Sequence, residues 1–333
     1  NRTRFILDDL ADGTALARWS AKVAQECDVG IVSRYPTADI IWVIDESGST
    51  DDNRNDIIAN ANSLFTRALA AGLDFRMGVT GLEPESNTRR PPPEAFGVLC
   101  QGDRFLAPHE KQLFTACIKD PPGMQGGTEH GLVSAEAAVR RHLPRDDSSR
   151  RIRKGADLVL IIATDELPHS IRPLLSYQDP HQHPLAQPQQ TAVDVVVARY
   201  ASFFKGESDP EAKATVHLIG GVPGNSCNAE IGHGNLELVR ALGGQVADVC
   251  QADIGPSLDA ILDDIVGSAS PMPLDKVPIA VSLAVAVDGV AIERGHQRGF
   301  VYHADTNGLV FINTPFDVGS AVVSSYEYWV PAL

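Results

Sequence analysis

Three short polar stretches of this sequence carry oxygen-bearing side chains at spacings that suit a metal ion. The first is Asp45-Glu46-Ser47-Gly48-Ser49, in which a carboxylate and two hydroxyls alternate. Because this pentapeptide separates an apolar run from an amphipathic stretch, we expect a turn that directs these side chains at a common point. Oxygen donors of this kind suit Mg²⁺, Mn²⁺ or Ca²⁺. Taken alone, the pentapeptide would fit a helix N-cap with an Asx turn equally well.

Two further oxygen donors stand where loops join predicted elements. Thr128 comes just before an amphipathic stretch, and Asp165 closes the apolar run that begins at Leu158. A helix cap would explain any one of these positions, but three separated loops would have to agree by chance. The sequence therefore predicts one divalent-cation site. Its expected ligands are Asp45, Ser47, Ser49, Thr128 and Asp165.

In type and chain order, these five residues resemble the metal-ion-dependent adhesion site of von Willebrand factor A (VWA) domains, which include the ligand-binding domains of integrins. The resemblance implies that Ser47, Ser49 and Thr128 bind the metal directly. It also implies that Asp45 and Asp165 bind directly or through water. Neutral hydroxyl ligands leave the cation electrophilic, so that an Asp or Glu carboxylate of a partner completes its shell. The implied chemistry is recognition without bond breaking, and we do not expect an enzyme.

Features beside these residues suggest supporting roles. Asp51 and Asp52 follow the second serine, where some integrin chains hold a regulatory ion. The match is partial, and we expect these carboxylates to stabilise a helix N-terminus instead. Segment 166–190 is rich in Pro, Gln and His, and we expect a solvated loop that overhangs the metal face and shapes selectivity. The insertion 82–95 is expected to act likewise.

Alternating strand and helix patterns predict the fold around the site. Residues 38–45 form an apolar run typical of a parallel strand buried on both faces, and residues 57–69 repeat apolar positions at helical spacing. The resemblance covers about residues 36–268. It agrees with a doubly wound α/β fold, a mostly parallel, Rossmann-like sheet flanked by helices. Further strands are expected at 75–80, 157–163 and 216–219, and further helices at 129–143, 191–204, 235–242 and 256–267.

The C-terminal region has the pattern of a small all-β unit. Two prolines and several small residues in 268–277 indicate a domain boundary. Beyond it, apolar residues alternate over 281–287 up to Asp288-Gly289, a favoured hairpin turn, and Asn307-Gly308 marks a second. We expect three parts: an N-terminal segment 1–37 that packs on the β unit and has a weak helix near 14–25, a VWA domain at 38–268, and a sandwich-like β domain at 278–333.

The five cysteines favour disulfides over a metal or redox motif, because none are in C-x-x-C spacing. Cys100 and Cys117 bracket one short segment, and Cys227 and Cys250 bracket another, which leaves Cys27 over. Two local bridges would indicate an oxidising compartment. Buried free thiols in a cytosolic protein are the alternative.

Composition excludes several classes of function. A net charge of −15 disfavours nucleic-acid binding, which needs a basic face. Common motifs of Ser hydrolases, P-loop enzymes and zinc proteases are missing from the sequence. The start at Asn1 lacks an apolar signal core, so we expect a mature or trimmed end and membrane anchoring through a removed signal or lipid segment.

These observations lead to three hypotheses. The first is a divalent-cation-dependent adhesin, extracellular or on a bacterial surface, whose architecture loosely resembles that of gliding-motility adhesins of myxobacteria. The second is an intracellular VWA-type assembly subunit that works with an AAA+ ATPase, for which reduced cysteines would argue. The third is a metallohydrolase, which would require turnover that disappears with the metal.

Overall fold

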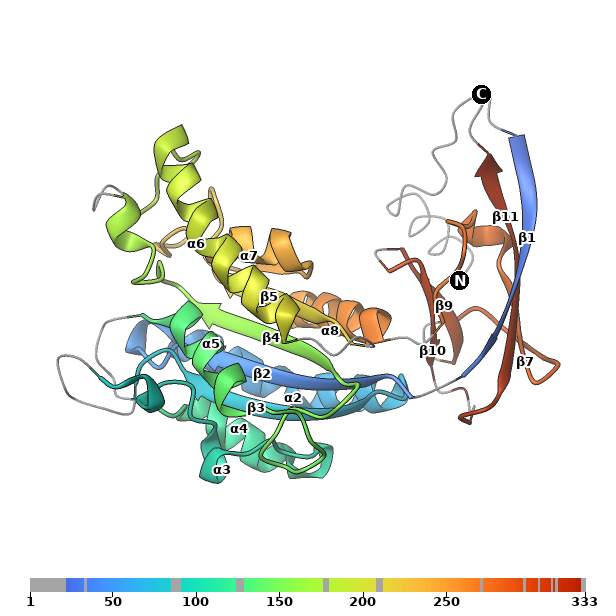
Figure 1. The fold of residues 1–333 in the computed structure, drawn as a ribbon, viewed down its shortest axis with the longest axis horizontal. Helices are drawn as coiled ribbons and strands as arrows, with labels where there is room; N and C mark the ends of the chain where they lie inside the picture. The colour runs from blue at the N-terminus through green and yellow to red at the C-terminus, as the bar shows by residue number, and fades with distance from the viewer. Residues whose placement is uncertain are drawn as a thin grey trace. The chain divides into compact units, whose positions relative to one another are not determined.

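The computed structural model describes most of the chain and divides it into two compact units (Figure 1). The α/β unit comprises Thr37–Arg67 and Phe75–Ile265, and the β unit comprises Asn1–Pro36, Ala68–Asp74 and Val266–Leu333. The residues described are 22–32, 35–84, 91–123, 129–175, 180–207, 212–269, 272–295, 298–304, 306–312, 314 and 317–330.

A five-stranded sheet forms the centre of the α/β unit. Its strand order is β3-β2-β4-β5-β6, and the pairs from β2 to β6 are parallel. Every residue of β4 is buried, as expected for a strand covered on both faces. The strands are β2 (Thr37–Ile44), β3 (Asp74–Gly81), β4 (Asp157–Thr164), β5 (Ala214–Gly220) and β6 (Val246–Asp248).

Helices cover both faces of this sheet. On one face, Ile41 and Val43 of β2 belong to a core shared with helices α5, α6 and α7. On the other face, Trp42 packs edge-on against Phe114 of α4, which also contacts Phe65 of α2. The predicted α/β sheet flanked by helices is therefore confirmed. The helices are α2 (Asp51–Ala70), α3 (Cys100–Asp103), α4 (Lys111–Lys119), α5 (Gly131–Arg141), α6 (Gln187–Gly206), α7 (Asn235–Leu242) and α8 (Gly255–Ala269).

The β unit contains a four-stranded antiparallel sheet, ordered β1-β11-β7-β8, and a two-stranded sheet, β10-β9. Both predicted hairpins are confirmed. The turn of one is Asp288-Gly289, where both residues have positive φ, and the turn of the other ends with Asn307, whose φ is 48°. The strands are β1 (Lys22–Ile31), β7 (Ala284–Val287), β8 (Val290–Ile292), β9 (Gly299–His303), β10 (Gly308–Ile312) and β11 (Ala321–Val330).

The N-terminal segment differs from the expectation of a helix at 14–25. Residues 22–25 belong to β1, which pairs with β11 over ten residues, from Lys22↔Val330 to Ile31↔Ala321. Side chains of β1 alternate between exposed and half-buried, so the period of two, set by the pairing with β11, outweighs the weak helical pattern. Residues 14–21 lie outside the described part of the chain.

The start of the C-terminal β region also differs from the expectation. Residues 280–282 form a short 3₁₀ helix rather than a strand, because the amide and hydroxyl of Ser282 both donate to the Ile279 carbonyl at 2.8 Å. Within the predicted linker 268–277, Met272 and Leu274 are buried in the core of the β unit. These two residues anchor the linker to the β unit, whereas Val277 is 59% exposed.

Candidate metal site

The carboxyl ends of β2 and β4 bring two of the predicted ligands to the same edge of the sheet. The strands are adjacent and parallel, with Ile44 opposite Ala163, so Asp45 and Asp165 leave the sheet side by side. The chain passes from β2 to β3 on one side, whereas β4 lies on the other side of β2. This edge is therefore a topological switch point, where α/β sheets commonly bind ligands.

The two serine side chains of the loop 45–49 lie beside Asp165. The hydroxyls of Ser47 and Ser49 lie 2.8 Å apart, and Ser49 Oγ donates to Asp165 Oδ1 at 3.3 Å. Asp45 is buried, and its Oδ1 accepts the Ser47 amide at 2.9 Å. The structure thus gathers four of the five predicted ligands, and Thr128 lies outside the described residues.

Thr50, just before helix α2, and Arg54 of α2 hold the main chain of this loop. Thr50 Oγ1 lies 2.9 Å from the carbonyl oxygens of both Asp45 and Ser47. The buried guanidinium of Arg54 donates to the same two carbonyls and forms an ion pair with Asp51. Asp51 and Asp52 both lie in the first turn of α2, and their stabilising role there stays a prediction. The loop is fixed in shape by the protein's own hydrogen bonds.

Carboxylates are concentrated around the converging side chains. Burial, followed by the negative charge of Asp45, raises the pKa of Asp165. Burial raises the pKa of Glu46 to about 7, against the lowering effect of its backbone hydrogen bonds. Burial and the adjacent Glu129 raise the pKa of Glu166 to about 8. Burial therefore disfavours the charged form of these carboxyl groups, and a bound cation would favour it again.

The spacing of the oxygens fits a small, hard cation. Around Mg²⁺, whose ligands lie about 2.0–2.1 Å from the metal in an octahedron, adjacent oxygens are about 2.9 Å apart. The observed separations, 2.8 Å for Ser47–Ser49 and 3.3 Å for Ser49–Asp165, fall close to this value. Within the described residues, no group of three or more His, Cys, Asp or Glu is arranged to hold a metal ion. The fit therefore depends on the hydroxyl donors.

The loop after β4 is tied to its surroundings at several points. The His169 amide donates to the Glu129 carbonyl at 2.7 Å, and the His169 ring packs edge-on against that of His130. Arg172 forms an ion pair with Glu230, which also accepts the Leu167 amide at 2.8 Å. These contacts place part of segment 166–190 beside Asp165. Residues 176–179 of that loop, and residues 85–90 of the predicted insertion 82–95, lie outside the described residues.

Several acidic residues near the site were missed by sequence reasoning. Glu46, Glu129 and Glu166 each directly follow a predicted ligand in the chain, and this adjacency is the only sequence signal they carry. Glu230 carries no such signal, because it is far from the predicted ligands in the sequence and only the fold brings it near them. Its amide donates to the Asp165 carbonyl at 2.8 Å.

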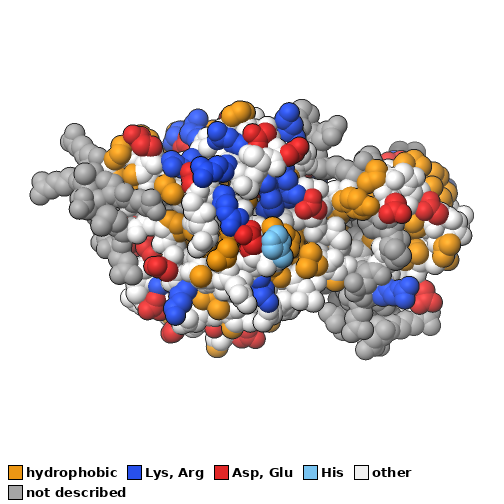
Figure 2. All heavy atoms as spheres, turned by 90° about the horizontal axis from the view of Figure 1, so that it is seen from below, with side chains coloured by type: hydrophobic (Ala, Val, Ile, Leu, Met, Phe, Trp, Pro, Cys, Tyr) orange, Lys and Arg blue, Asp and Glu red, His pale blue; other side chains and the backbone are white. Residues whose placement is uncertain are grey.

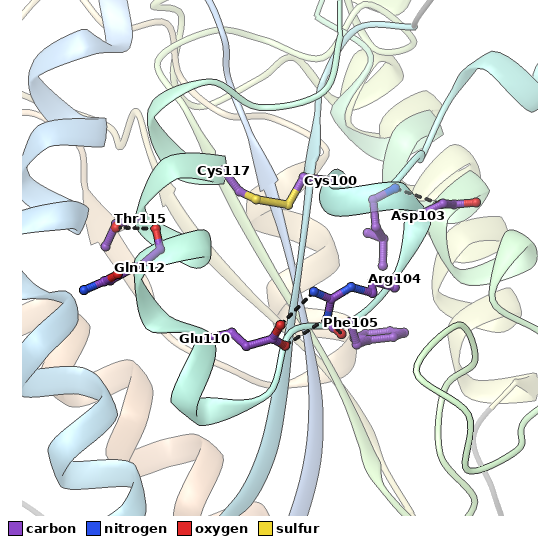
Figure 3. Close-up of a disulfide and its surroundings, with 9 residues drawn as sticks. Cys100, Asp103, Arg104, Phe105, Glu110, Gln112, Thr115 and Cys117 are labelled. Carbon is purple, nitrogen blue, oxygen red and sulfur yellow. Dashed lines mark hydrogen bonds and ion pairs between the residues drawn. A yellow bond between two sulfur atoms is a disulfide. The ribbon is translucent and has the colours of Figure 1, made fainter.

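Both predicted disulfides are confirmed. Cys100 is joined to Cys117 and Cys227 to Cys250, whereas Cys27 is free and exposed. Figure 3 shows the first bridge between α3 and α4, beside the ion pair of Arg104 with Glu110. Two such bridges are typical of proteins that fold in an oxidising compartment.

Basic side chains gather on one face of the α/β unit (Figure 2). Many arginines of this unit already have carboxylate partners, as in the ion pairs Arg76–Asp39 and Arg141–Asp103. Their positive charge is therefore largely neutralised within the protein. None of the helices in the described part of the chain is long and apolar enough to cross a membrane.

Comparisons with known proteins find only distant likenesses. No family model matches the sequence, and no curated protein matches it. Among solved structures, the pilus adhesin SpaC of Lactobacillus rhamnosus GG is 12% identical, with a TM-score of 0.43, over 92% of this chain and 42% of that chain. Proximal thread matrix protein 1 of the mussel byssus is 16% identical, with a TM-score of 0.37, over 72% of this chain and 48% of that chain.

This chain therefore spans less than half the length of these solved chains. Likenesses with TM-scores below 0.5 do not establish a shared family or function. The class of protein defined by the structure itself is an α/β unit with a parallel sheet, joined to a small antiparallel β unit.

Proposed function

We propose that this chain is a VWA-type binding module that captures an acidic group of a partner through a divalent cation, Mg²⁺ or else Mn²⁺ or Ca²⁺. One observation carries the proposal: the oxygens of Ser47, Ser49 and Asp165 converge at 2.8 and 3.3 Å at the switch point of the sheet. These residues were selected from the sequence by type and order alone. Their convergence supports the resemblance to the VWA metal site.

Each residue has a definite part in this proposal. Ser47, Ser49 and Thr128 hold the cation, while Asp45 and Asp165 balance its charge directly or through water. Bound there, the cation supplies an electrophilic position for a partner carboxylate. Asp45 is prepared for its part, because the Ser47 amide and the Thr164 hydroxyl, at 2.9 and 2.7 Å, fix the orientation of its carboxylate.

The two disulfides favour a site of action outside the cytosol. We therefore place the module on a bacterial surface or in the extracellular space, as an adhesin. The alternative, an intracellular subunit that assists an AAA+ ATPase, would have to form these bridges in a reducing compartment. A metallohydrolase stays the third hypothesis, and cation-dependent turnover of a substrate would be needed to support it.

Calorimetry with Mg²⁺ and Mn²⁺, on wild type and Asp45→Ala, tests the metal half of the proposal. For recognition, the probe is an array of peptides that contain Asp or Glu, each paired with its Asn or Gln counterpart. We expect binding to the acidic peptides to disappear in EDTA and to return with Mg²⁺ or Mn²⁺. Peptide binding that is indifferent to both EDTA and Asp45→Ala would overturn recognition through the metal.

A further inference from the structure

Glu46, the second residue of the metal loop 45–49, is buried but makes none of the contacts among the predicted ligands. Only 5% of this residue is exposed. Its Oε2 accepts the amide of Leu82 at 2.8 Å, and its Oε1 accepts the amide of Glu83 at 2.8 Å. Both amides belong to the loop that follows β3. One side chain of the metal loop thus caps two main-chain donors of a neighbouring loop.

A second loop approaches the same carboxylate. A Cβ atom added at Gly123 would collide with Glu46 Oε1, and one added at Gly81 would lie 2.9 Å from both carboxylate oxygens. The Gly81 amide also donates to the Pro122 carbonyl at 2.8 Å. Two glycines therefore allow segments 81–83 and 121–123 to close around Glu46. In the sequence, Thr128 follows Gly123 by five residues.

The hydrogen bonds continue from Glu46 to helix α5. Leu82, whose amide binds Glu46, has a carbonyl that accepts the Ser134 hydroxyl of α5 at 2.8 Å. Ser134 is fully buried, so this bond has no competition from water. Helix α5 begins at Gly131, three residues after Thr128. Glu46 is therefore linked to the elements on either side of the segment that contains Thr128.

We propose that Glu46 is a positioning residue that locks the loop after β3 and the loop 121–123 against the metal loop. This inference rests on the proposed function, because it assigns Glu46 to the support of that cation site. Glu46 acts through main-chain amides and binds neither cation nor partner. A carboxylate is suited to this task, since it offers an acceptor oxygen to each of two parallel N–H donors, whereas an amide side chain offers one.

The test measures Mn²⁺ affinity by calorimetry on the full chain. Glu46→Gln keeps the shape of the side chain but turns an NH₂ group towards one of the two amides. We expect its Mn²⁺ affinity to fall roughly 10- to 100-fold, as when other residues that orient metal ligands are changed. The matched control is Asp39→Asn, which alters a buried carboxylate near the start of β2, the strand before the metal loop, and should leave Mn²⁺ affinity unchanged.

Gly123→Ala places a methyl group against the Glu46 carboxylate and displaces it. This variant tests the proposal if Glu46→Gln fails to fold. We expect a comparable loss of affinity, and the double variant Glu46→Gln/Gly123→Ala should lose less than the sum of the two single changes, because both disturb the same set of contacts. Wild type without Mn²⁺ affinity would overturn the proposed function and this inference with it. Wild-type affinity retained in both Glu46→Gln and Gly123→Ala would overturn the inference alone.

Discussion

One buried aspartate lies near the start of strand β2 and another just beyond its end, and their carboxylates have opposite kinds of partner. Asp39, near the start of the strand, is fully buried between two arginines: it accepts Arg76 Nη2 at 2.6 Å and Arg153 Nε at 2.8 Å. Asp45, just beyond the end, is 2% exposed. Its carboxylate accepts hydrogen bonds from neutral donors, the Ser47 amide and the Thr164 hydroxyl.

The difference shows where the protein neutralises its own charge. A buried carboxylate needs a positive partner, and at the start of β2 the arginines provide it. At the far end, the guanidinium of Arg54 contacts the main-chain carbonyls of Asp45 and Ser47 and forms its ion pair with Asp51. Asp45 and Asp165 thus share an edge that has excess negative charge, which is the condition under which a divalent cation binds well.

The largest effect on stability is expected at the neutralised end. Asp39→Asn leaves Arg76 and Arg153, whose side chains are 12% and 14% exposed, without their carboxylate. Breaking a buried ion pair in this way costs about 3–5 kcal/mol. Urea unfolding should show this loss in the free energy of unfolding. If Mn²⁺ affinity falls as well, the two ends of β2 are coupled, and the contrast drawn between them is wrong.

The largest effect on cation binding is expected at the other end. Asp45→Ala removes charge that balances the cation, so Mg²⁺ affinity should fall by at least about 100-fold, a change of about 2.7 kcal/mol. Stability should then lose its dependence on Mg²⁺. Wild type should gain about 2.7 kcal/mol when Mg²⁺ is present at 100 times its Kd, whereas Asp45→Ala should gain almost nothing. Thermal unfolding with and without EDTA measures both, and an equal gain in the two proteins would contradict the assignment.

A buried histidine adds a third way of accommodating a buried ionisable group, because its ring stays neutral instead of pairing with an opposite charge. His217 of β5 is fully buried, and its Nδ1 accepts the Gln245 amide at 3.0 Å. Burial lowers its pKa to about 3, even though Asp264 Oδ2 lies 3.7 Å from Nε2. Below about pH 6.5 the His217 ring takes up a proton in the unfolded chain, whereas in the folded protein it does so only near pH 3. Stability contributed by the neutral ring is therefore lost as the pH falls through this window.

The slope attributable to His217 is up to about 1.4 kcal/mol per pH unit, the value for one proton. His217→Gln retains an acceptor for the Gln245 amide and should flatten the decline between pH 6 and pH 4. Urea unfolding of both proteins at several pH values measures the difference. Identical slopes would mean that His217 is protonated in the folded protein and pairs with Asp264, and His217 would then no longer be an example of a buried group that stays neutral.

Sequence patterns predicted the buried central strands of the α/β unit better than its short helices and strands. The apolar runs of β2 and β4 are unmistakable, because both strands are covered on both faces. Helix α4 was missed because its nine residues carry only Phe114, Cys117 and Ile118 as buried positions. Strand β6 was missed because three residues are too few to show a period.

At the candidate site, too, features set by neighbouring residues could be predicted, whereas contacts between residues far apart in the sequence could not. Residue types and chain order sufficed to select Asp45, Ser47, Ser49 and Asp165, because each lies where an element begins or ends. The support from Glu46 could not be predicted, since it depends on amides 36 and 37 residues away in the chain. Contacts at such separation follow from how the loops pack and leave no period in the sequence.

The smallest effect is expected from the hydroxyl ligands, and it separates charge from geometry at the cation-binding end of β2. Ser49→Ala removes the oxygen that lies between Ser47 Oγ and Asp165 Oδ1, at 2.8 and 3.3 Å, but it leaves both carboxylates in place. Water can replace a neutral ligand, so Mg²⁺ affinity should fall by about tenfold or less, at most about 1.4 kcal/mol. Thr128→Ala, at a position outside the described residues, should be similarly mild. Calorimetry on these variants beside Asp45→Ala ranks the two kinds of donor. A loss for Ser49→Ala as large as that for Asp45→Ala would show that the geometry of the hydroxyls, rather than the uncompensated negative charge, governs binding at this edge of the sheet.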